Sequence, residues 1–419
     1  MKILKLSPYF FPEHVSSTHL SKNLKEGYLK AGFYIENYVP IPTRGVDYET
    51  RKKYSKIKYE ELEDGHVIVH RFFMFQEGKN SIQRAIRYIL VNFLQYLKGT
   101  KAKDIDVIMG ASTPPTQGLL CGLVKRKLSK RYGKKVPFVY NLQDIFPDSL
   151  VHTGLTRKGS LLWKIGRRIE DFTYRNADKI IVISEDFKKN IMAKGVSEDK
   201  IVVVPNWVDT DDVYPIARKD NVLIERYHLD PNKFYITYSG NIGYTQNMDM
   251  LLDAAKEITN GDIRFILIGE GAAKVEVEKR VREENIKNVI MLPFQPYADI
   301  AHVFSLGDAG LIISKPGVSN NSVPSKTWSI MSAARPVIAS FDLESELCSI
   351  IRRSESGLCV PPDDPQALKN AILKLYSDKE KRIKFGKNGR EFVLKNLTRE
   401  AGTAKYVQVV REVFEKSSY

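Results

Sequence analysis

Residues 234–258, "FYITYSGNIGYTQNMDMLLDAAKEI", decide the fold of this chain. An apolar, β-rich run passes through a turn that holds Gly240 and Gly243, and then enters an amphipathic stretch of helix length. A strand followed by a helix in this way is the unit from which parallel sheets are built, because the helix returns the chain to the starting edge of the sheet. The same order of elements continues on both sides of this stretch.

Short apolar runs that alternate with helix-length segments predict an α/β protein with parallel sheets. Several runs are almost uninterrupted in their apolar character, as expected for strands covered on both faces. The predicted strands are 2–7, 33–40, 66–73, 106–112, 137–144, 179–184, 201–205, 234–240, 263–269, 289–293, 309–314 and 336–340. One predicted helix, 81–98, carries an apolar stripe that consists of Ile82, Ile86, Ile89, Phe93 and Leu97.

The alternation pauses at residues 205–233, a polar and acidic stretch with prolines that is typical of a connection between domains. We expect one Rossmann-like domain over 1–205 and a second Rossmann-like domain over 206–395. The last predicted helix, 396–419, is expected to cross back and pack on the first domain. In this fold class ligands bind beyond the carboxyl ends of the strands, and we expect both domains to present those ends to a shared cleft.

Length and cysteine usage limit the classes of protein that remain. The chain has 419 residues, 43% of them hydrophobic, which is enough for two cores. Its three cysteines form neither a metal-binding pattern nor a disulfide framework, which fits a reducing cytoplasm. We expect no signal peptide, and no run reaches the roughly 18 apolar residues of a membrane-spanning helix.

Positive charge is concentrated in the first half of the chain. Residues 1–200 contain 36 Lys and Arg against 21 Asp and Glu, whereas the remainder is balanced at 29 of each. The densest segment is Lys125–Lys135, with seven cations. It is either a solvated helix face or a site for a polyanion. No nucleic-acid motif is present, and aromatic residues do not alternate with the cations, so an anionic membrane or a lipid phosphate is the favoured partner.

The turn at the end of the predicted strand 234–240 is a candidate phosphate site. Gly240 and Gly243 let the backbone approach a ligand closely, while Asn241 and Gln246 offer amide donors before a helix N-terminus. The turn is neither a Walker A loop nor a full GxGxxG motif. A glycine-rich turn without a ligand is therefore the alternative.

A second candidate is "NNSVPSKTWSIMSAARPVIAS", residues 320–340, which predicts a loop, a helix opened at Pro324, and a strand. Lys326 is a cation at the start of that helix, where unpaired N–H groups and the helix dipole also favour an anion. As a compact charge it suits phosphate. An exposed lysine with no ligand is the alternative.

Two loops of the first domain are candidates for polar contacts with a ligand at the rim of the expected cleft. In residues 7–24, Ser16, Ser17 and Thr18 precede a predicted helix and either cap it or line the site. In residues 141–154, Asp144 ends a strand and Asp148 follows Pro147. A carboxylate there can accept a proton from a sugar hydroxyl or orient it, although Asp148 is equally suited to capping a helix.

Taken together, these segments resemble family 4 glycosyltransferases of the GT-B fold over nearly the whole chain. The segments that carry the resemblance are 182–184, 203–209, 240–255, 266–271, 324–340 and 357–364. Residues 141–150 and 322–331 resemble a subgroup from O-antigen and capsule operons that includes N-acetylfucosamine transferases. The family is one of hexosyltransferases that retain the anomeric configuration and need no bound metal or other cofactor.

The resemblance implies a nucleotide-sugar donor, with UDP as the expected nucleotide, and a sugar on a polyprenyl diphosphate as acceptor. Donor binding is expected of the second domain, by Gly240, Asn241, Gly243, Gln246, Glu270, Phe294, Pro324, Ser325 and Lys326. Acceptor binding is expected of the first, by Ser16, Ser17, Thr18, Asp144 and Asp148. Asp144 and Lys326 are the expected catalytic residues, because positive charge stabilises a departing diphosphate.

The chain departs from the common family pattern at two places. Asn321 and Ser329 stand where many relatives have two glutamates, of which the second holds the ribose. Asn241 and Gln246 stand where many relatives have an Arg and a Lys. Two cations are therefore missing from the expected diphosphate site, which increases the importance of Lys326.

The chain is thus expected to be a cytoplasmic enzyme, peripheral on the inner face of the cell membrane, with an anionic membrane surface and no nucleic acid among its partners. We expect it to contact the membrane through Lys125–Lys135 and through the predicted helix 81–98. Two alternatives remain. A GT-B-fold sugar-nucleotide epimerase would share the architecture and act without an acceptor. A non-catalytic, basic protein would bind lipid or DNA but no nucleotide.

Overall fold

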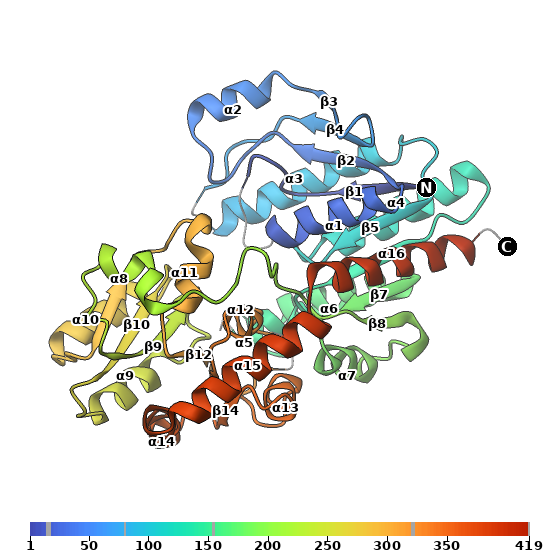
Figure 1. The fold of residues 1–419 in the computed structure, drawn as a ribbon. Coiled ribbons are helices and arrows are strands. Elements are labelled where there is room, and N and C mark those ends of the chain that lie inside the picture. The colour runs from blue at the N-terminus through green and yellow to red at the C-terminus, as the bar shows by residue number, and fades with distance from the viewer. Residues whose placement is uncertain (14–17, 79–80, 153–155, 320–322, 418–419) are drawn as a thin grey trace. The chain divides into compact units, whose positions relative to one another are not determined.

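The computed structural model describes residues 1–13, 18–78, 81–152, 156–319 and 323–417 (Figure 1). The chain forms two compact units. Unit 1 comprises Met1–Pro205 together with Gly402–Tyr419, and unit 2 comprises Asn206–Ala401. Each unit contains one largely parallel sheet with helices packed on it, so the predicted α/β class with two Rossmann-like sheets is confirmed.

Unit 1 has an eight-stranded sheet in the order β3-β4-β2-β1-β5-β6-β7-β8. All neighbours are parallel except β3, which pairs antiparallel with β4 at the edge. Its strands are β1 (Lys2–Leu6), β2 (Tyr34–Pro40), β3 (Tyr59–Leu62), β4 (Val67–Phe72), β5 (Val107–Ala111), β6 (Phe138–Leu142), β7 (Lys179–Val182) and β8 (Ile201–Val203). The central strands β1, β5 and β6 consist mostly of buried residues, as the nearly continuous apolar runs predict.

Helices cover this sheet, and two of them contact at a glycine. A Cβ at Gly27 of α1 would lie 2.7 Å from the Cβ of Thr403 of α16, so the two helices approach closely. The Tyr406 hydroxyl of α16 contacts Asn141 at the end of β6 at 2.9 Å. The helices are α1 (Thr18–Lys30), α2 (Tyr48–Ser55), α3 (Ser81–Gly99), α4 (Gln117–Tyr132), α5 (Asp148–His152), α6 (Leu161–Asn176), α7 (Glu185–Ala193) and α16 (Arg399–Glu415).

Unit 2 has a six-stranded, all-parallel sheet in the order β11-β10-β9-β12-β13-β14. In register, Ile236 of β9 pairs with Phe265 of β10 on one side and with Ala309 of β12 on the other. All three side chains are buried in the core. The strands are β9 (Phe234–Ser239), β10 (Ile263–Ile268), β11 (Val289–Leu292), β12 (Ala309–Ile313), β13 (Val337–Ser340) and β14 (Gly357–Val360).

The helices of unit 2 follow its strands along the chain, except the first, which precedes β9. They are α8 (Val222–Arg226), α9 (Met248–Glu257), α10 (Lys274–Glu283), α11 (Ile300–Ser305), α12 (Lys326–Ser332), α13 (Glu346–Arg353), α14 (Pro365–Ser377) and α15 (Lys379–Asn396). Short 3₁₀ turns occupy Glu198–Lys200, Arg218–Asp220 and Tyr297–Asp299. Among the helices that the structure describes, none is long and apolar enough to cross a membrane.

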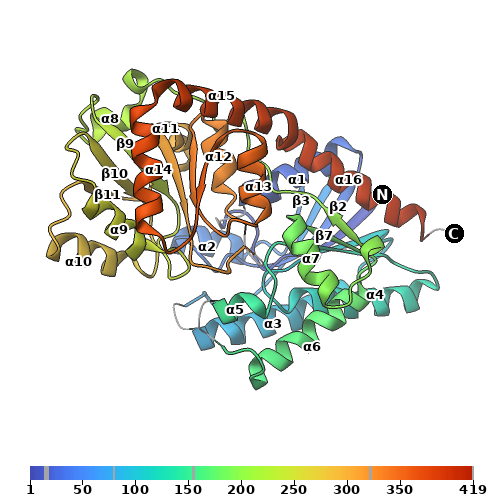
Figure 2. The same cartoon turned by 90° about the horizontal axis from the view of Figure 1, so that it is seen from below.

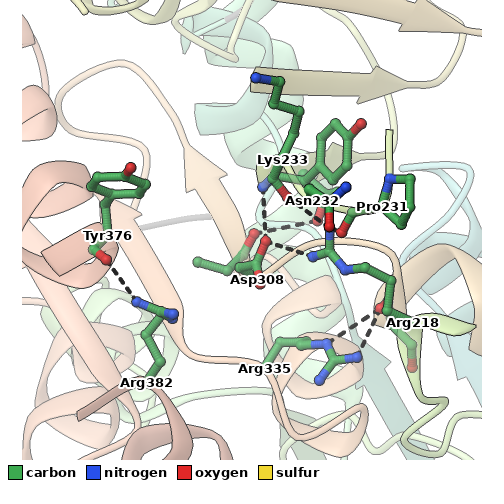
Figure 3. A network of polar contacts seen from close by, with 12 residues as sticks. Arg218, Pro231, Asn232, Lys233, Asp308, Arg335, Tyr376 and Arg382 are labelled. Carbon is green, nitrogen blue, oxygen red and sulfur yellow. Dashed lines mark hydrogen bonds and ion pairs between the residues drawn. The ribbon is translucent and has the colours of Figure 1, made fainter. Parts of the chain in front are cut away.

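A polar network fixes the segment that follows residue 206 to the amino end of the unit 2 sheet (Figure 3). Asp308 accepts hydrogen bonds from Arg218 at 2.6 Å and from the backbone N–H of Tyr235 at 2.8 Å. Arg335 donates to the carbonyl of Ile216 at 2.9 Å. The stretch expected to connect the domains is therefore part of unit 2 over most of its length.

Candidate active site

The order of the unit 2 strands locates a candidate site at the ends of β9 and β12. From β9 the chain builds β10 and β11 on one side, and then returns to build β12, β13 and β14 on the other. In doubly wound sheets ligands bind beyond the carboxyl ends of the strands, where this reversal separates two neighbouring loops. Here those loops are 240–247, after β9, and the loop from Ser314 to α12, of which residues 320–322 lie outside the described part.

Lys326 lies where the strand order reverses, and it contacts the end of β9. It is the first residue of α12, and its Nζ donates a hydrogen bond to the Tyr238 hydroxyl at 3.1 Å. The same nitrogen lies 4.4 Å from the centre of the Tyr238 ring, within range of a cation–π contact. Burial lowers the pKa of Lys326 to about 8. The ammonium thus has a hydroxyl and an aromatic ring as partners, and no carboxylate among the described residues forms an ion pair with it.

Gly240 provides the space that Lys326 occupies. Its φ is +144°, and a Cβ built there would lie only 2.0 Å from the Lys326 nitrogen. The Tyr238 hydroxyl in turn donates to the carbonyl of Asn241 at 2.5 Å, which fixes the start of the loop. Lysine, tyrosine and glycine therefore form one packed group, in which any side chain at position 240 would displace the ammonium.

The loops after β9 and β10 interlock through two further glycines. A Cβ at Gly269 would lie 1.9 Å from the carbonyl oxygen of Gly240, and one at Gly271 would lie 2.2 Å from that of Ile242. A backbone hydrogen bond from the N–H of Ile242 to the carbonyl of Glu270 joins the two loops in the same place. The main chain of the candidate site is thus held closely by its neighbour, which favours a preformed shape.

Asn241 and Gln246 bond to each other and to the loop. The Gln246 carbonyl oxygen accepts from the backbone N–H of Gly243 at 3.1 Å and from the Asn241 amide at 3.4 Å. These contacts use the acceptor of Gln246 to shape the turn, while Asn241 stays exposed to solvent. The two residues therefore carry no charge to the site, and they stabilise its main chain.

The remaining predicted donor residues follow strands or precede α12 at the same edge of the sheet. Glu270 follows β10 and forms an ion pair with Lys274 at 2.6 Å. Phe294 follows β11 and is 69% exposed. Pro324 and Ser325 precede α12, where their carbonyls accept from the first N–H groups of the helix at 3.0 Å.

In unit 1, the two predicted aspartates have different environments. The backbone N–H of Asp144 donates to Ser112 at 3.1 Å, and its side chain is exposed. Desolvation by the surrounding protein nevertheless raises the pKa of the Asp144 carboxyl. A hydrogen bond with Thr113 offsets part of this increase. Asp148 begins α5 and pairs with Lys194 at 2.7 Å. Asp144 is thus the more available carboxylate.

The other acceptor candidates lie at the edge of what is described. Ser16 and Ser17 fall outside the described residues. Thr18 is the first residue of α1, and its side chain is likewise not described.

Sequence reasoning missed a group of charges around Glu77. This buried carboxylate lies 3.3 Å from Arg84, 3.4 Å from Arg87 and 3.9 Å from Arg44, and it accepts a hydrogen bond from Tyr9 at 2.5 Å. Arg87 is completely buried, and its Nη2 also reaches the hydroxyl of Thr43 at 2.5 Å. Three arginines around one glutamate leave an excess of positive charge. The residues are scattered over positions 9–87, so no local pattern indicates the group.

The Lys125–Lys135 segment is less free than its composition indicates. Four of its seven cations have partners inside unit 1: Lys125 and Lys135 pair with Asp178 at 2.6 and 2.8 Å, Arg126 donates to Asn176, and Arg131 donates to the carbonyl of Thr100. Most of the segment therefore stabilises the packing of α4.

A separate hollow of about 530 Å³ opens at the opposite edge of the unit 2 sheet. It is lined by residues that include Asp308, Arg335, Arg382 and Arg390. Arg382 donates to the carbonyl of Tyr376 at 2.9 Å, as Figure 3 shows, and Arg335 to that of Ile216. These arginines thus stabilise the backbone of neighbouring segments. None of the predicted donor residues lines the hollow.

The geometry defines a class of protein: two Rossmann-like units in one chain, with a lysine and a glycine-rich turn where the second sheet reverses. Residues 42–212 match the pattern described as Glycosyltransferase Family 4, and residues 220–392 match that of Glycosyl transferases group 1. The chain is a glycosyltransferase of the GT-B type. Within the described residues, no group of His, Cys, Asp and Glu is arranged to hold a metal ion.

Curated relatives carry glycosyltransferase names, and solved structures match the fold. The chain is 27% identical to the Pseudomonas aeruginosa glycosyltransferase WbjE, over 71% of this chain and 73% of that protein. It is 24% identical to the Escherichia coli K12 colanic acid biosynthesis glycosyl transferase WcaI, over 98% and 100%. Its fold matches sucrose-phosphate synthase from Thermosynechococcus elongatus, with a TM-score of 0.72 at 18% identity over 99% of this chain and 100% of that one. It also matches Anabaena HepE in complex with UDP and glucose, with a TM-score of 0.71 at 15% identity over 98% and 100%.

Proposed function

We propose that the protein transfers a sugar from a UDP-sugar to a sugar carried on a polyprenyl diphosphate, with retention of configuration and without a metal ion, in O-antigen or capsule biosynthesis. N-acetylfucosamine or a related amino sugar is the proposed donor sugar. The names of its relatives support the process, since they include colanic acid biosynthesis and an O-antigen chain mannosyltransferase. The HepE complex with UDP supports the nucleotide.

The observation that carries the proposal is the Lys326 ammonium at the strand-order reversal, held above Tyr238 and beside Gly240. When the bond between the anomeric carbon and the diphosphate breaks, negative charge develops on the phosphate oxygen. A cation placed there beforehand stabilises that charge without reorganisation during the reaction. In this chain Lys326 does so without the two further cations of many relatives, so we assign it the main electrostatic role.

On the acceptor side we assign Asp144 to the attacking hydroxyl, which a carboxylate can orient or deprotonate. Asp148 is occupied by Lys194, so we assign it to holding α5. The partly exposed Arg44 and Arg84 suit the diphosphate of the acceptor, because guanidinium groups bind phosphate through paired hydrogen bonds, whereas Arg87 is buried and adds only its charge. We further propose that the enzyme works in the cytoplasm, peripherally at the inner face of the cell membrane.

Thermal unfolding in the presence of nucleotides tests the donor assignment. A ligand that binds only the native state stabilises it by mass action, by about 2.7 kcal/mol at a hundredfold excess over Kd. We expect UDP and UDP-sugars to raise the melting temperature more than ADP, GDP or CMP. No stabilisation by any nucleotide would refute the proposal, and conversion of a UDP-sugar to its epimer without acceptor would favour the epimerase instead.

The affinity for UDP is expected to depend on the pKa of Lys326. Below its value of about 8 the ammonium is charged and binds the diphosphate, whereas above it each binding event must first take up a proton. Affinity should therefore fall above pH 8, by up to about tenfold per pH unit. Calorimetric titrations of the wild type and of Lys326→Arg, whose charge persists throughout, provide the comparison. Equal pH profiles for the two proteins would contradict the assignment.

A further inference from the structure

The outer face of α3 is apolar although it faces solvent. Ile89 is 64% exposed and Phe93 is 57% exposed, and both lie on one stripe of the helix. The exposed members of this stripe are Ile86, Ile89, Leu90, Phe93 and Leu97, at spacings of three, four, seven and eleven residues from the first. The apolar stripe that the sequence predicts is thus present, but it points away from the core.

The inner face of α3 explains why the apolar stripe points outward, because polar residues occupy that inner face. Arg87 and Gln95 are fully buried on either side of Val91. Gln95 donates to the carbonyls of Ser7 and Tyr38 at 2.9 and 2.8 Å, and Arg87 to that of Pro8 at 3.2 Å. The core side of α3 thus clamps the strand ends through hydrogen bonds, and the large apolar side chains remain outside.

The apolar surface continues over two neighbouring helices of unit 1. Helix α4 packs between α3 and α6, and the three lie on one side of the sheet in Figure 2. Leu123 of α4 is exposed, as are three residues at the start of α6, namely Leu161, Leu162 and Ile165. Leu161, at 75% exposure, is among the most exposed of them. Monomeric soluble proteins rarely expose large apolar side chains in such number on one face.

The charges beside this surface are positive. Neither α3 nor α4 contains an acidic residue, and in α6 both Glu170 and Asp171 pair with Arg167. By contrast, no ion pair within the described residues involves Lys98, Lys127, Lys130, Lys164 or Arg168. Lys127 and Lys130 lie four and seven positions after Leu123, and Arg168 lies three positions after Ile165, on the same sides of their helices.

We propose that the face formed by α3, α4 and α6 docks on the surface of an anionic lipid bilayer, with its apolar residues inserted at the level of the acyl chains and its lysines and arginines among the head groups. An apolar stripe bordered by cations is the pattern that binds such an interface. A second copy of the chain fits less well, since a two-fold contact would bring the same uncompensated cations together. The inference rests on the proposed function, for which it identifies the lipid surface that carries the acceptor. The docking face differs from the Lys125–Lys135 segment, most of whose cations are paired.

The wild-type protein can report on docking through its own fluorescence. Trp163, beside Leu162 on α6, is the only tryptophan of unit 1, whereas Trp207 and Trp328 are buried in unit 2. The full chain is mixed with vesicles of phosphatidylcholine, with or without phosphatidylglycerol, and separated by flotation. We expect flotation with the anionic vesicles and quenching of Trp163 by brominated lipid. Absence of both would overturn the proposal.

Substitutions then locate the contact. Ile89→Glu with Phe93→Glu is expected to reduce partitioning by at least about tenfold, because two charged groups would enter the apolar layer. Val275→Glu on α10, an equally exposed position in unit 2, is the matched control and should bind as the wild type does. A double variant that still floats would overturn the proposal, and so would a double variant that only converts a wild-type dimer to a monomer. Because no sugar transfer is measured, the outcome is independent of the donor assignment.

Discussion

Lys326→Ala is expected to lower both the affinity for UDP and the rate of sugar transfer by about 10- to 150-fold. This corresponds to about 1.5–3 kcal/mol, the scale of a hydrogen bond that involves a charged group. The loss should be large because the loop after β9 adds no cation of its own at Asn241 and Gln246, and those two residues bond to the loop itself. Isothermal titration with UDP and single-turnover transfer measure the two effects separately.

The stability of the variant distinguishes a binding role from a structural one. The folded protein lowers the pKa of Lys326 to about 8, so between about pH 8 and its unfolded value the unfolded chain binds more protons. The free energy of unfolding therefore rises with pH in that window. At neutral pH the buried ammonium is charged, and its desolvation lowers the stability of the folded protein. Lys326→Met should be at least as stable as the wild type at pH 7 and yet bind UDP weakly. A folded variant with unchanged affinity and rate would refute the role of Lys326.

Much of the fold follows from local patterns. All twelve predicted strands exist, because buried parallel strands are read directly as uninterrupted apolar runs. The two missed strands are at edges: β3, "YEEL", is mostly solvated and antiparallel, and β14, "GLCV", is only four residues long. An edge strand has one hydrogen-bonded neighbour and little burial, so its sequence carries a weak signal.

The orientation of α3 shows what periodicity leaves undetermined. An apolar stripe of helical spacing predicts that one face of a helix is apolar, but it does not reveal what that face contacts. Here the core needs hydrogen-bond donors for the carbonyls at the ends of β1 and β2, and Arg87 and Gln95 supply them. That requirement depends on loops distant in the sequence, so no window of residues around α3 reveals it.

The candidate site shows the same limit. Lys326 and Gly240 could be singled out by residue type and position, yet the contact that joins them could not. Tyr238 lies 88 positions from Lys326, and its role as the partner of the ammonium depends on β9 and β12 being neighbours in the sheet. A tyrosine two residues before a glycine turn is otherwise an ordinary strand residue.

Gly240→Ala is expected to be the most damaging of the small substitutions, because it combines backbone strain with displacement of the ammonium. At φ +144° an L-residue is strained, at a cost of about 1–3 kcal/mol. The added methyl would also lie 2.0 Å from the Lys326 nitrogen, so the lysine must move away from Tyr238. We expect lower stability together with a loss of UDP affinity comparable to that of Lys326→Ala. Gly261→Ala is the matched control, since a Cβ there meets nothing within 4 Å.

A double-mutant cycle separates the two effects of the methyl group at position 240. In the Lys326→Ala background the strain of the backbone persists, but there is no ammonium left to displace. Gly240→Ala should therefore still reduce stability there, while its further effect on UDP affinity becomes small. Residues in direct contact couple in this non-additive way, by about 0.5–3 kcal/mol. If the two substitutions reduced UDP affinity independently, glycine and lysine would act at separate places, and the ammonium held beside Gly240 would not be the group that binds the diphosphate.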